Sequence, residues 1–274
     1  MIDETKLPPP SFWTRAGRGA AKAGAATGRL ALGAGRGVLA GYHALDPDLR
    51  RHLAQLPLLG LTLLGKRQAA PLALPDDQHR PVLFIHGLGG HRGNFLPARA
   101  FFHLNGRSRT YAVGFPASAT LDGMAEELSR TIAAILEVNG LPPGAQLDLV
   151  AHSMGGLVAR LALEDAATAA RVAHLVTLGT PHAGTHAARF ADTAFVTPLR
   201  PGSPLMVRLA RQLPWSDALP RLTAFWSAAD VILLPSRTAS VEGAVNVELE
   251  GFTHYSYLLD PVGFRKIFAA LDPR

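Results

Sequence analysis

The stretch that decides the fold is Gln146–Leu157, which reads Q-L-D-L-V-A-H-S-M-G-G-L. Its first half is a short apolar run typical of a buried strand, and from Leu157 onward apolar residues recur at helical spacing. A strand that turns abruptly into a helix at Ser153 is the arrangement of a nucleophile elbow, which lifts a serine hydroxyl clear of the sheet. Gly155 provides the small residue that this turn needs. Ala151 replaces the other usual glycine, and a plain helix N-cap is the alternative explanation for the serine.

Length and composition narrow the class of protein. A chain of 274 residues can hold one large α/β domain with an appendage. The chain has no cysteine, which excludes a disulfide framework, a thiolate zinc site and a cysteine nucleophile, and which fits a reducing compartment. The formal net charge of +6 is concentrated near the N-terminus and no nucleic-acid-binding motif accompanies it, so we expect no nucleic-acid partner.

The first 75 residues form a distinct N-terminal extension by composition. Residues 11–41 are rich in Ala, Gly and Arg, and their basic residues fall on one face of a helix. This pattern indicates a basic helix at a membrane surface, with a flexible arm as an equal alternative. Asp3 and Glu4 stand where a secretory signal would be positive, so we recognise no secretory signal and expect a cytoplasmic chain, with peripheral membrane contact as an open alternative. The basic residues are Arg15, Arg18, Lys22, Arg29 and Arg36.

The apolar run Leu53–Gly65 is too short to span a bilayer and contains Pro57. It is interpreted as a membrane-contacting segment or as a helix pair that closes over the site. Pro71–Arg80 is interpreted as a linker, which gives two parts: an N-terminal extension over residues 1–75 and a catalytic domain over residues 80–274. Deletion of residues 1–70 is expected to spare hydrolysis of short soluble esters.

Strands and helices alternate after the linker. Apolar strands that alternate with helices predict an α/β fold with a mostly parallel sheet and helices on both faces. The strands are expected at 81–86, 109–115, 146–151, 171–178, 221–227 and 245–249, and the helices at 121–138, 204–213 and 262–271.

A serine hydroxyl needs a histidine to take its proton and a carboxylate to orient that histidine. In the fold with this elbow the chain order is serine, acid, histidine. Asp230 follows one expected strand and His254 follows the last one, so both lie where parallel sheets place their sites. Asp217 and Glu250 are the rival acids: the first precedes its strand and the second is too close to His254.

The stabilisation of an oxyanion requires two backbone donors. The Met154 N–H is one candidate. The glycine-rich loop His86-Gly87-Leu88-Gly89-Gly90 follows the first core strand and offers the Leu88 N–H as the second. A phosphate-binding loop is the alternative, but the chain lacks the G-x-G-x-x-G pattern and the P-loop lysine there.

Five sequence blocks in this order resemble the small bacterial triacylglycerol lipases and related esterases of the α/β-hydrolase superfamily. The likeness runs from Arg80 to the C-terminus. The blocks are H-G-L-G-G (86–90), A-H-S-M-G-G (151–156), G-T-P-H-A-G-T (179–185), R-P-G-S-P (200–204) and the tail from S-A-A-D (227–230) to G-F-T-H (251–254).

The resemblance implies Ser153, Asp230 and His254 as a catalytic triad, with Leu88 and Met154 as oxyanion donors. It also implies that the loop Gly179–Thr185 lines the site. The substrate-binding residues expected on this basis are His86, Gly87, His152, Pro181 and His182.

The expected function is hydrolysis of an acyl ester or lipid through an acyl-enzyme. A thioesterase or acyltransferase with the same triad is an alternative, and so is a noncatalytic membrane-associated interaction protein. No cofactor is expected, and no metal site, because the histidine separations do not make a ligand pair. The apolar interval Gly184–Pro220 is expected to wall an acyl pocket over Ser153, with packing on the domain's own flank as the alternative.

Overall fold

The computed structural model describes residues 45–65, 70–116 and 118–271. The predictions made for the basic arm at 11–41 lie outside these residues.

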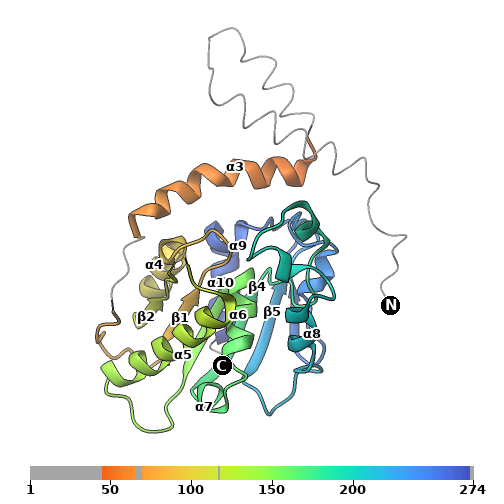
Figure 1. Ribbon diagram of the computed structural model, residues 1–274. Helices are drawn as coiled ribbons and strands as arrows, with labels where there is room; N and C mark the ends of the chain where they lie inside the picture. The colour runs from red at the N-terminus through yellow and green to blue at the C-terminus, as the bar shows by residue number, and fades with distance from the viewer. Residues whose placement is uncertain (1–44, 66–69, 117, 272–274) are drawn as a thin grey trace.

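A six-stranded, fully parallel sheet forms the centre of the molecule (Figure 1). The prediction of an α/β-hydrolase fold is confirmed, and each expected strand is present with ends that differ by at most a few residues. The strand order is β2-β1-β3-β4-β5-β6. The strands are β1 (Val82–Ile85), β2 (Thr110–Ala112), β3 (Leu147–His152), β4 (Val172–Leu178), β5 (Arg221–Trp226) and β6 (Val245–Glu248).

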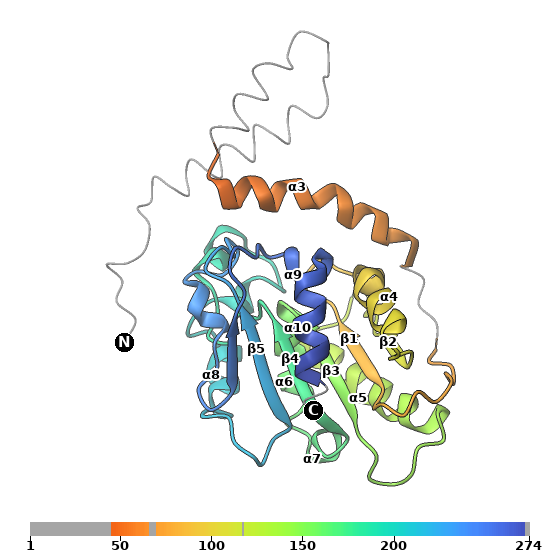
Figure 2. The ribbon, with the colours of Figure 1, turned by 180° about the vertical axis from the view of Figure 1, so that it is seen from behind.

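Helices cover both faces of the sheet. Successive side chains of a strand point to opposite faces, so the apolar strands bury side chains on both sides. In β1, Leu83 and Ile85 belong to the core beneath α5 (Leu121–Val138) and α6 (Met154–Ala162), which Figure 1 shows in front. The alternate residues Val82 and Phe84 belong to the opposite core, beneath α4 (Leu96–Leu104) and α10 (Pro261–Leu271), which Figure 2 shows in front. The shorter elements are α7 (Ala166–Ala169), α8 (Pro204–Ala210), α9 (Ser256–Leu259), η3 (Arg92–Phe95), η4 (His186–Phe190), η5 (Thr197–Leu199) and η6 (Ser236–Ala239).

The sheet changes winding direction at β1, because β2 pairs with one edge of this strand and β3 with the other. Such a switch point leaves a crevice at the carboxyl ends of the two diverging strands. The loop 86–90 leaves β1 there, and Ser153 leaves β3 there. The topology therefore places both candidate motifs at one crevice.

The helix α3 (Pro47–Leu61) lies across one end of the sheet, followed by the 3-10 turn η2 (Thr62–Gly65) (Figures 1 and 2). Asp46 caps it by accepting a hydrogen bond from the Asp48 N–H at 2.9 Å. The alternative of a helix pair over Leu53–Gly65 is wrong, since one α-helix runs through Pro57 to Leu61 and only a 3-10 turn follows it. Pro57 is exposed, and the first half of the helix is held by contacts with the loop after β6.

Two other segments differ from the sequence-based expectation. Helix α8 ends at Ala210, three residues early, and α4 had not been anticipated. Residues 70–80 form neither helix nor strand, but they are anchored to the domain. The Asp77 carboxylate accepts hydrogen bonds from the backbone N–H groups of Ser108 and Arg109.

Candidate active site

Ser153 occupies a strained turn between β3 and α6. Its φ of 56° and ψ of −129° lie in a region that non-glycine residues rarely adopt and that costs roughly 1–3 kcal/mol. The turn is held by a hydrogen bond from the Ser153 N–H to the Leu178 carbonyl oxygen at 2.9 Å. A Cβ added at Gly155 would lie 2.6 Å from the carbonyl oxygen of His86. Small residues are therefore required here because the elbow passes directly against β1.

The structure brings Ser153, His254 and Asp230 together. His254 Nε2 lies 2.9 Å from Ser153 Oγ, and His254 Nδ1 lies 2.8 Å from Asp230 Oδ2. The other carboxylate oxygen of Asp230 accepts the Ile232 N–H at 3.0 Å. All three side chains are buried. Both rival acids, Asp217 and Glu250, are exposed instead.

His152 supports the main chain of His254. Its Nε2 lies 2.8 Å from the His254 carbonyl oxygen, and the two rings are 4.7 Å apart. Complete burial lowers the pKa of His152 well below its usual value, and proximity to His254 lowers it further. A neutral His152 with its proton on Nε2 donates to that carbonyl.

Helix α3 holds the same loop from the solvent side. The Gln55 side chain accepts a hydrogen bond from Thr253 Oγ1 at 2.6 Å and donates one to Ser256 Oγ at 2.9 Å. His52 stacks on the Tyr255 ring at 4.6 Å, and its pKa is lowered to about 4, chiefly by burial and then by His254. Sequence reasoning did not identify these α3 residues, because nothing local in the sequence links them to residues some 200 positions away.

The glycine-rich loop after β1 packs against the serine. A Cβ at Gly87 would lie 2.7 Å from Ser153 Cβ, so only glycine allows this approach. Gly89 has a φ of 67°, and the Gly90 N–H closes the turn on the Gly87 carbonyl oxygen at 3.1 Å. Leu88 stands between these glycines, and Met154 begins α6 directly after the serine.

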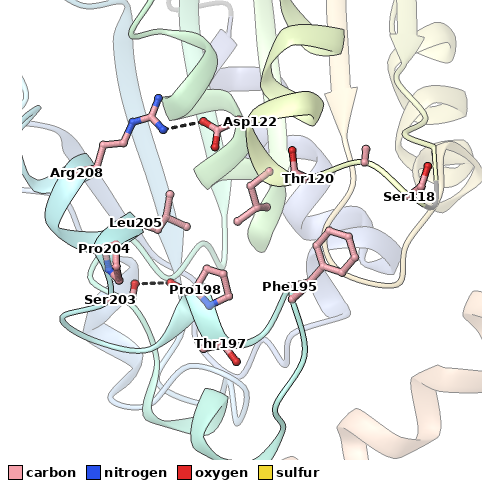
Figure 3. A pocket seen from close by; sticks show the side chains of 13 residues that line it. Ser118, Thr120, Asp122, Phe195, Thr197, Pro198, Ser203, Pro204, Leu205 and Arg208 are labelled. Carbon is pink, nitrogen blue, oxygen red and sulfur yellow. Dashed lines mark hydrogen bonds and ion pairs between the residues drawn. The ribbon is translucent and has the colours of Figure 1, made fainter.

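Two hollows bear on the site, and the glycine-rich loop lines one of them. The first, which we name the α3 hollow, has a volume of about 250 Å³. It is lined by Leu59, Gly60, Leu63, residues 86–91, Asn94, His152, Tyr255 and Leu258. The second, the α5 hollow, has a volume of about 590 Å³ and lies between the start of α5 and the segment 194–208 (Figure 3).

The predicted substrate-binding residues fall into two groups. His86, Gly87 and His152 line the α3 hollow. Pro181 and His182 are buried and line neither hollow. The His182 ring is hydrogen bonded to Thr177 Oγ1 at 3.0 Å and to Arg160 Nη1 at 3.3 Å, so the ring supports the loop from inside rather than facing substrate.

The interval 184–220 also differs in part from its expected position. Leu199, Met206 and Leu209 are buried in the core with α5 and α6, whereas Phe190 is 66% exposed. Phe195 and Leu205 line the α5 hollow, which has no triad residue in its wall.

Within the described ranges, no three histidine or acidic side chains gather in a way that suits a metal ion. Over the same residues, every helix is too short or too polar to cross a bilayer.

Comparisons with known proteins agree with this architecture. Residues 77–195 match the model of the PGAP1-like alpha/beta domain. A triacylglycerol lipase from Burkholderia plantarii is 29% identical over 159 residues, which cover 53% of this chain and 42% of the relative. The chain thus spans less than half the length of this curated relative.

Solved structures share the fold at low sequence identity. The mature form of a Bacillus licheniformis lipase superposes with a TM-score of 0.61 at 16% identity, covering 73% of this chain and 95% of that one. A phospholipase from Legionella pneumophila superposes with a TM-score of 0.57 at 12% identity, covering 71% of this chain and 59% of that one. A monoacylglycerol lipase from Paleococcus ferrophilus superposes with a TM-score of 0.51 at 17% identity, covering 70% of this chain and 95% of that one. The chain therefore has the α/β-hydrolase fold, and over part of its length it is similar in sequence to a PGAP1-like alpha/beta domain and to a triacylglycerol lipase.

Proposed function

We propose that the chain is a serine hydrolase that cleaves carboxylic esters through an acyl-enzyme on Ser153. The observation that carries this proposal is the chain of contacts from Ser153 Oγ through His254 to Asp230, at 2.9 and 2.8 Å. The strained backbone at Ser153 supports it further, because such strain accumulates at functional sites.

In the proposed mechanism His254 Nε2 takes the proton of Ser153 as Oγ attacks the ester carbonyl carbon. Asp230 holds the Nδ1 proton and fixes the tautomer in which Nε2 acts as the base. The backbone N–H groups of Leu88 and Met154 bind the oxyanion, and each such donor is typically worth about 3 kcal/mol of barrier. The bond to the alcohol then breaks, the alcohol oxygen takes the proton from Nε2, and water hydrolyses the acyl-enzyme by the same route.

The acyl chain is assigned to the α5 hollow. Its walls are mostly apolar and include Leu121, Phe195 and Leu205, and its charged pair of Arg208 and Asp122 lies 2.7 Å apart at the edge (Figure 3). The segment that lines it follows Phe115 in the chain. The Phe115 ring lies 5.2 Å from the ring of His86, which precedes the Gly87 that packs against Ser153. An elongated apolar acyl group suits such a hollow.

Hydrolysis of p-nitrophenyl esters of graded acyl length tests the proposal. We expect Ser153→Ala to abolish turnover while leaving the circular dichroism spectrum and melting temperature unchanged. Retention of near-wild-type turnover by the folded variant would sink the assignment. An acyl-coenzyme A series measured alongside separates ester from thioester preference.

Contact with a lipid surface is a second part of the proposal. Leu56, Leu58 and Leu63 expose 43%, 50% and 56% of their surfaces on α3 and η2, and the sequence before them is basic. Basic and apolar groups together favour an anionic membrane surface. Co-sedimentation with anionic vesicles is expected to fall in the double variant Leu56→Ser, Leu58→Ser. Equal binding by both proteins would remove the apolar part of this proposal.

A further inference from the structure

We propose that the α3 hollow receives the alcohol half of the ester and that Gly60 of α3 sets how large that alcohol can be. This inference rests on the proposed function, because it gives a place to one half of the proposed substrate.

The α3 hollow adjoins the reacting atoms. One wall contains Gly87, whose backbone lies so close to Ser153 that an added Cβ would approach the serine Cβ to 2.7 Å. Another wall contains His152 and Tyr255, which flank the serine and His254 in sequence. The Tyr255 ring lies 5.8 Å from the His254 ring. A group that enters this hollow therefore contacts Gly87, His152 and Tyr255, which adjoin Ser153 and His254, although those two residues do not line the hollow themselves.

The direction of proton transfer assigns this side to the alcohol. When the acyl-enzyme forms, Ser153 Oγ bonds to the acyl carbon and the bond from that carbon to the alcohol oxygen breaks. The oxygen takes its proton from His254 Nε2, so the alcohol must leave on the His254 side. Tyr255 and Leu258 follow His254 in sequence and line the α3 hollow. The α5 hollow shares no lining residue with it and stays available to the acyl chain.

The walls favour an uncharged, apolar alcohol. Leu59 and Leu63 line one side and Leu88 the other. Several polar side chains in the wall already have partners. The Asn94 amide oxygen accepts the His91 N–H at 2.6 Å, and its nitrogen donates to Thr62 Oγ1 at 3.1 Å. His86 Nδ1 lies 3.0 Å from the Gly87 carbonyl oxygen, and His152 Nε2 lies 2.8 Å from that of His254. We therefore take size and shape as the main basis of selection in this hollow.

Gly60 is the position where the size of the hollow is open to change. It lines the hollow, and a Cβ built on it would have no atom within 4 Å. It is helical, so a larger side chain there also removes the helix cost of glycine. A larger residue at this position therefore meets no atom at its Cβ and does not displace the backbone. Leu63 lines the same hollow, and a smaller side chain at this position would enlarge it.

The test uses the full chain and two ester series. One series keeps a butyryl group and varies the alcohol from methyl through benzyl to naphthylmethyl. The other keeps p-nitrophenol and varies the acyl chain. Acid release is followed with a pH indicator, and kcat/KM is compared because it reports the steps up to acyl-enzyme formation, in which the alcohol leaves.

We expect Gly60→Phe to lower kcat/KM for the naphthylmethyl ester at least tenfold relative to the methyl ester, and Leu63→Ala to shift the ratio the other way. The acyl-length profile should keep its shape. Ala54→Phe is the matched control, because Ala54 is on the same helix, is exposed and does not line the hollow.

An altered acyl-length profile in Gly60→Phe would overturn the assignment and give the hollow to the acyl group. An unchanged ratio for both series in the folded variant would show that the hollow holds neither half of the substrate. Ester hydrolysis that survives Ser153→Ala would instead overturn the proposed function, and this inference with it.

Discussion

Gln55 Nε2 donates a hydrogen bond to Ser256 Oγ over 2.9 Å, although the two residues are 201 positions apart in the chain. The same side chain accepts from Thr253, so one amide connects the residues on both sides of His254 and Tyr255. Arg51 adds a hydrogen bond to the Gly251 carbonyl oxygen at 2.8 Å. The loop that carries the proposed base is thus held by α3, which lies outside the 80–274 domain drawn from the sequence.

These contacts predict that removal of α3 damages catalysis itself. Deletion of residues 1–70 should lower kcat for short soluble esters by at least tenfold, because the His254 loop loses three hydrogen bonds. Deletion of residues 1–44, which keeps α3, should leave that rate near wild type. Equal rates for both truncated proteins would contradict this. This prediction is the opposite of the sequence-based expectation that short-ester hydrolysis survives the longer deletion.

The docking of α3 should weaken in acid because of His52. Its pKa is about 4 when buried against Tyr255, with the charges of His254 and Asp230 nearby, and near 6.5 when exposed. The pKa of His52 is lower when α3 is docked than when His52 is exposed. The contribution of His52 to docking is therefore complete above pH 6.5 and is lost as the pH falls toward 4. Amide hydrogen exchange of α3, corrected for intrinsic rates, should show less protection at pH 5 than at pH 8. Most of that difference should disappear in His52→Gln. Equal protection at both pH values in the wild type would refute the role of His52 in docking.

The acid of the triad is tested by paired substitutions. Asp230→Asn keeps the shape but offers the wrong hydrogen-bond partner to His254 Nδ1, so kcat should fall by roughly 10²–10⁴-fold. Asp217→Asn changes an exposed carboxylate and should have no comparable effect. Steady-state kinetics on one p-nitrophenyl ester decides between them, and a large loss in Asp217→Asn alone would reassign the acid.

The elbow also makes a prediction about stability. Gly155→Ala forces a Cβ against backbone carbonyl oxygens at 2.6 and 2.7 Å, which should cost about 1–3 kcal/mol. Gly60→Ala adds the same atom where nothing lies within 4 Å and should cause no loss. Thermal unfolding followed by circular dichroism compares the two. A melting temperature of Gly155→Ala equal to that of wild type would show that the elbow tolerates a larger residue.

The parts of the fold that local pattern determines were predictable. The strand before Ser153 and the helix α5 follow directly from apolar periodicity, and α5 begins and ends where the sequence indicated. The course of the chain through Pro57 was not predictable, because contacts between Gln55 and a loop 200 residues later stabilise the helix there. The same limit applies to His182, whose ring is fixed by the distant Arg160. Motif spacing identifies the loop but not the direction of the side chain.

The nucleophile is the centre of this account, and covalent labelling tests it most directly. A fluorophosphonate probe reacts with activated serines and forms an adduct that peptide mass spectrometry can locate. We predict one adduct, on the peptide that contains Ser153, which is absent in Ser153→Ala and greatly reduced in His254→Ala because the hydroxyl then lacks its base. An adduct on a different serine, or equal labelling of Ser153 with and without His254, would contradict the proposed mechanism.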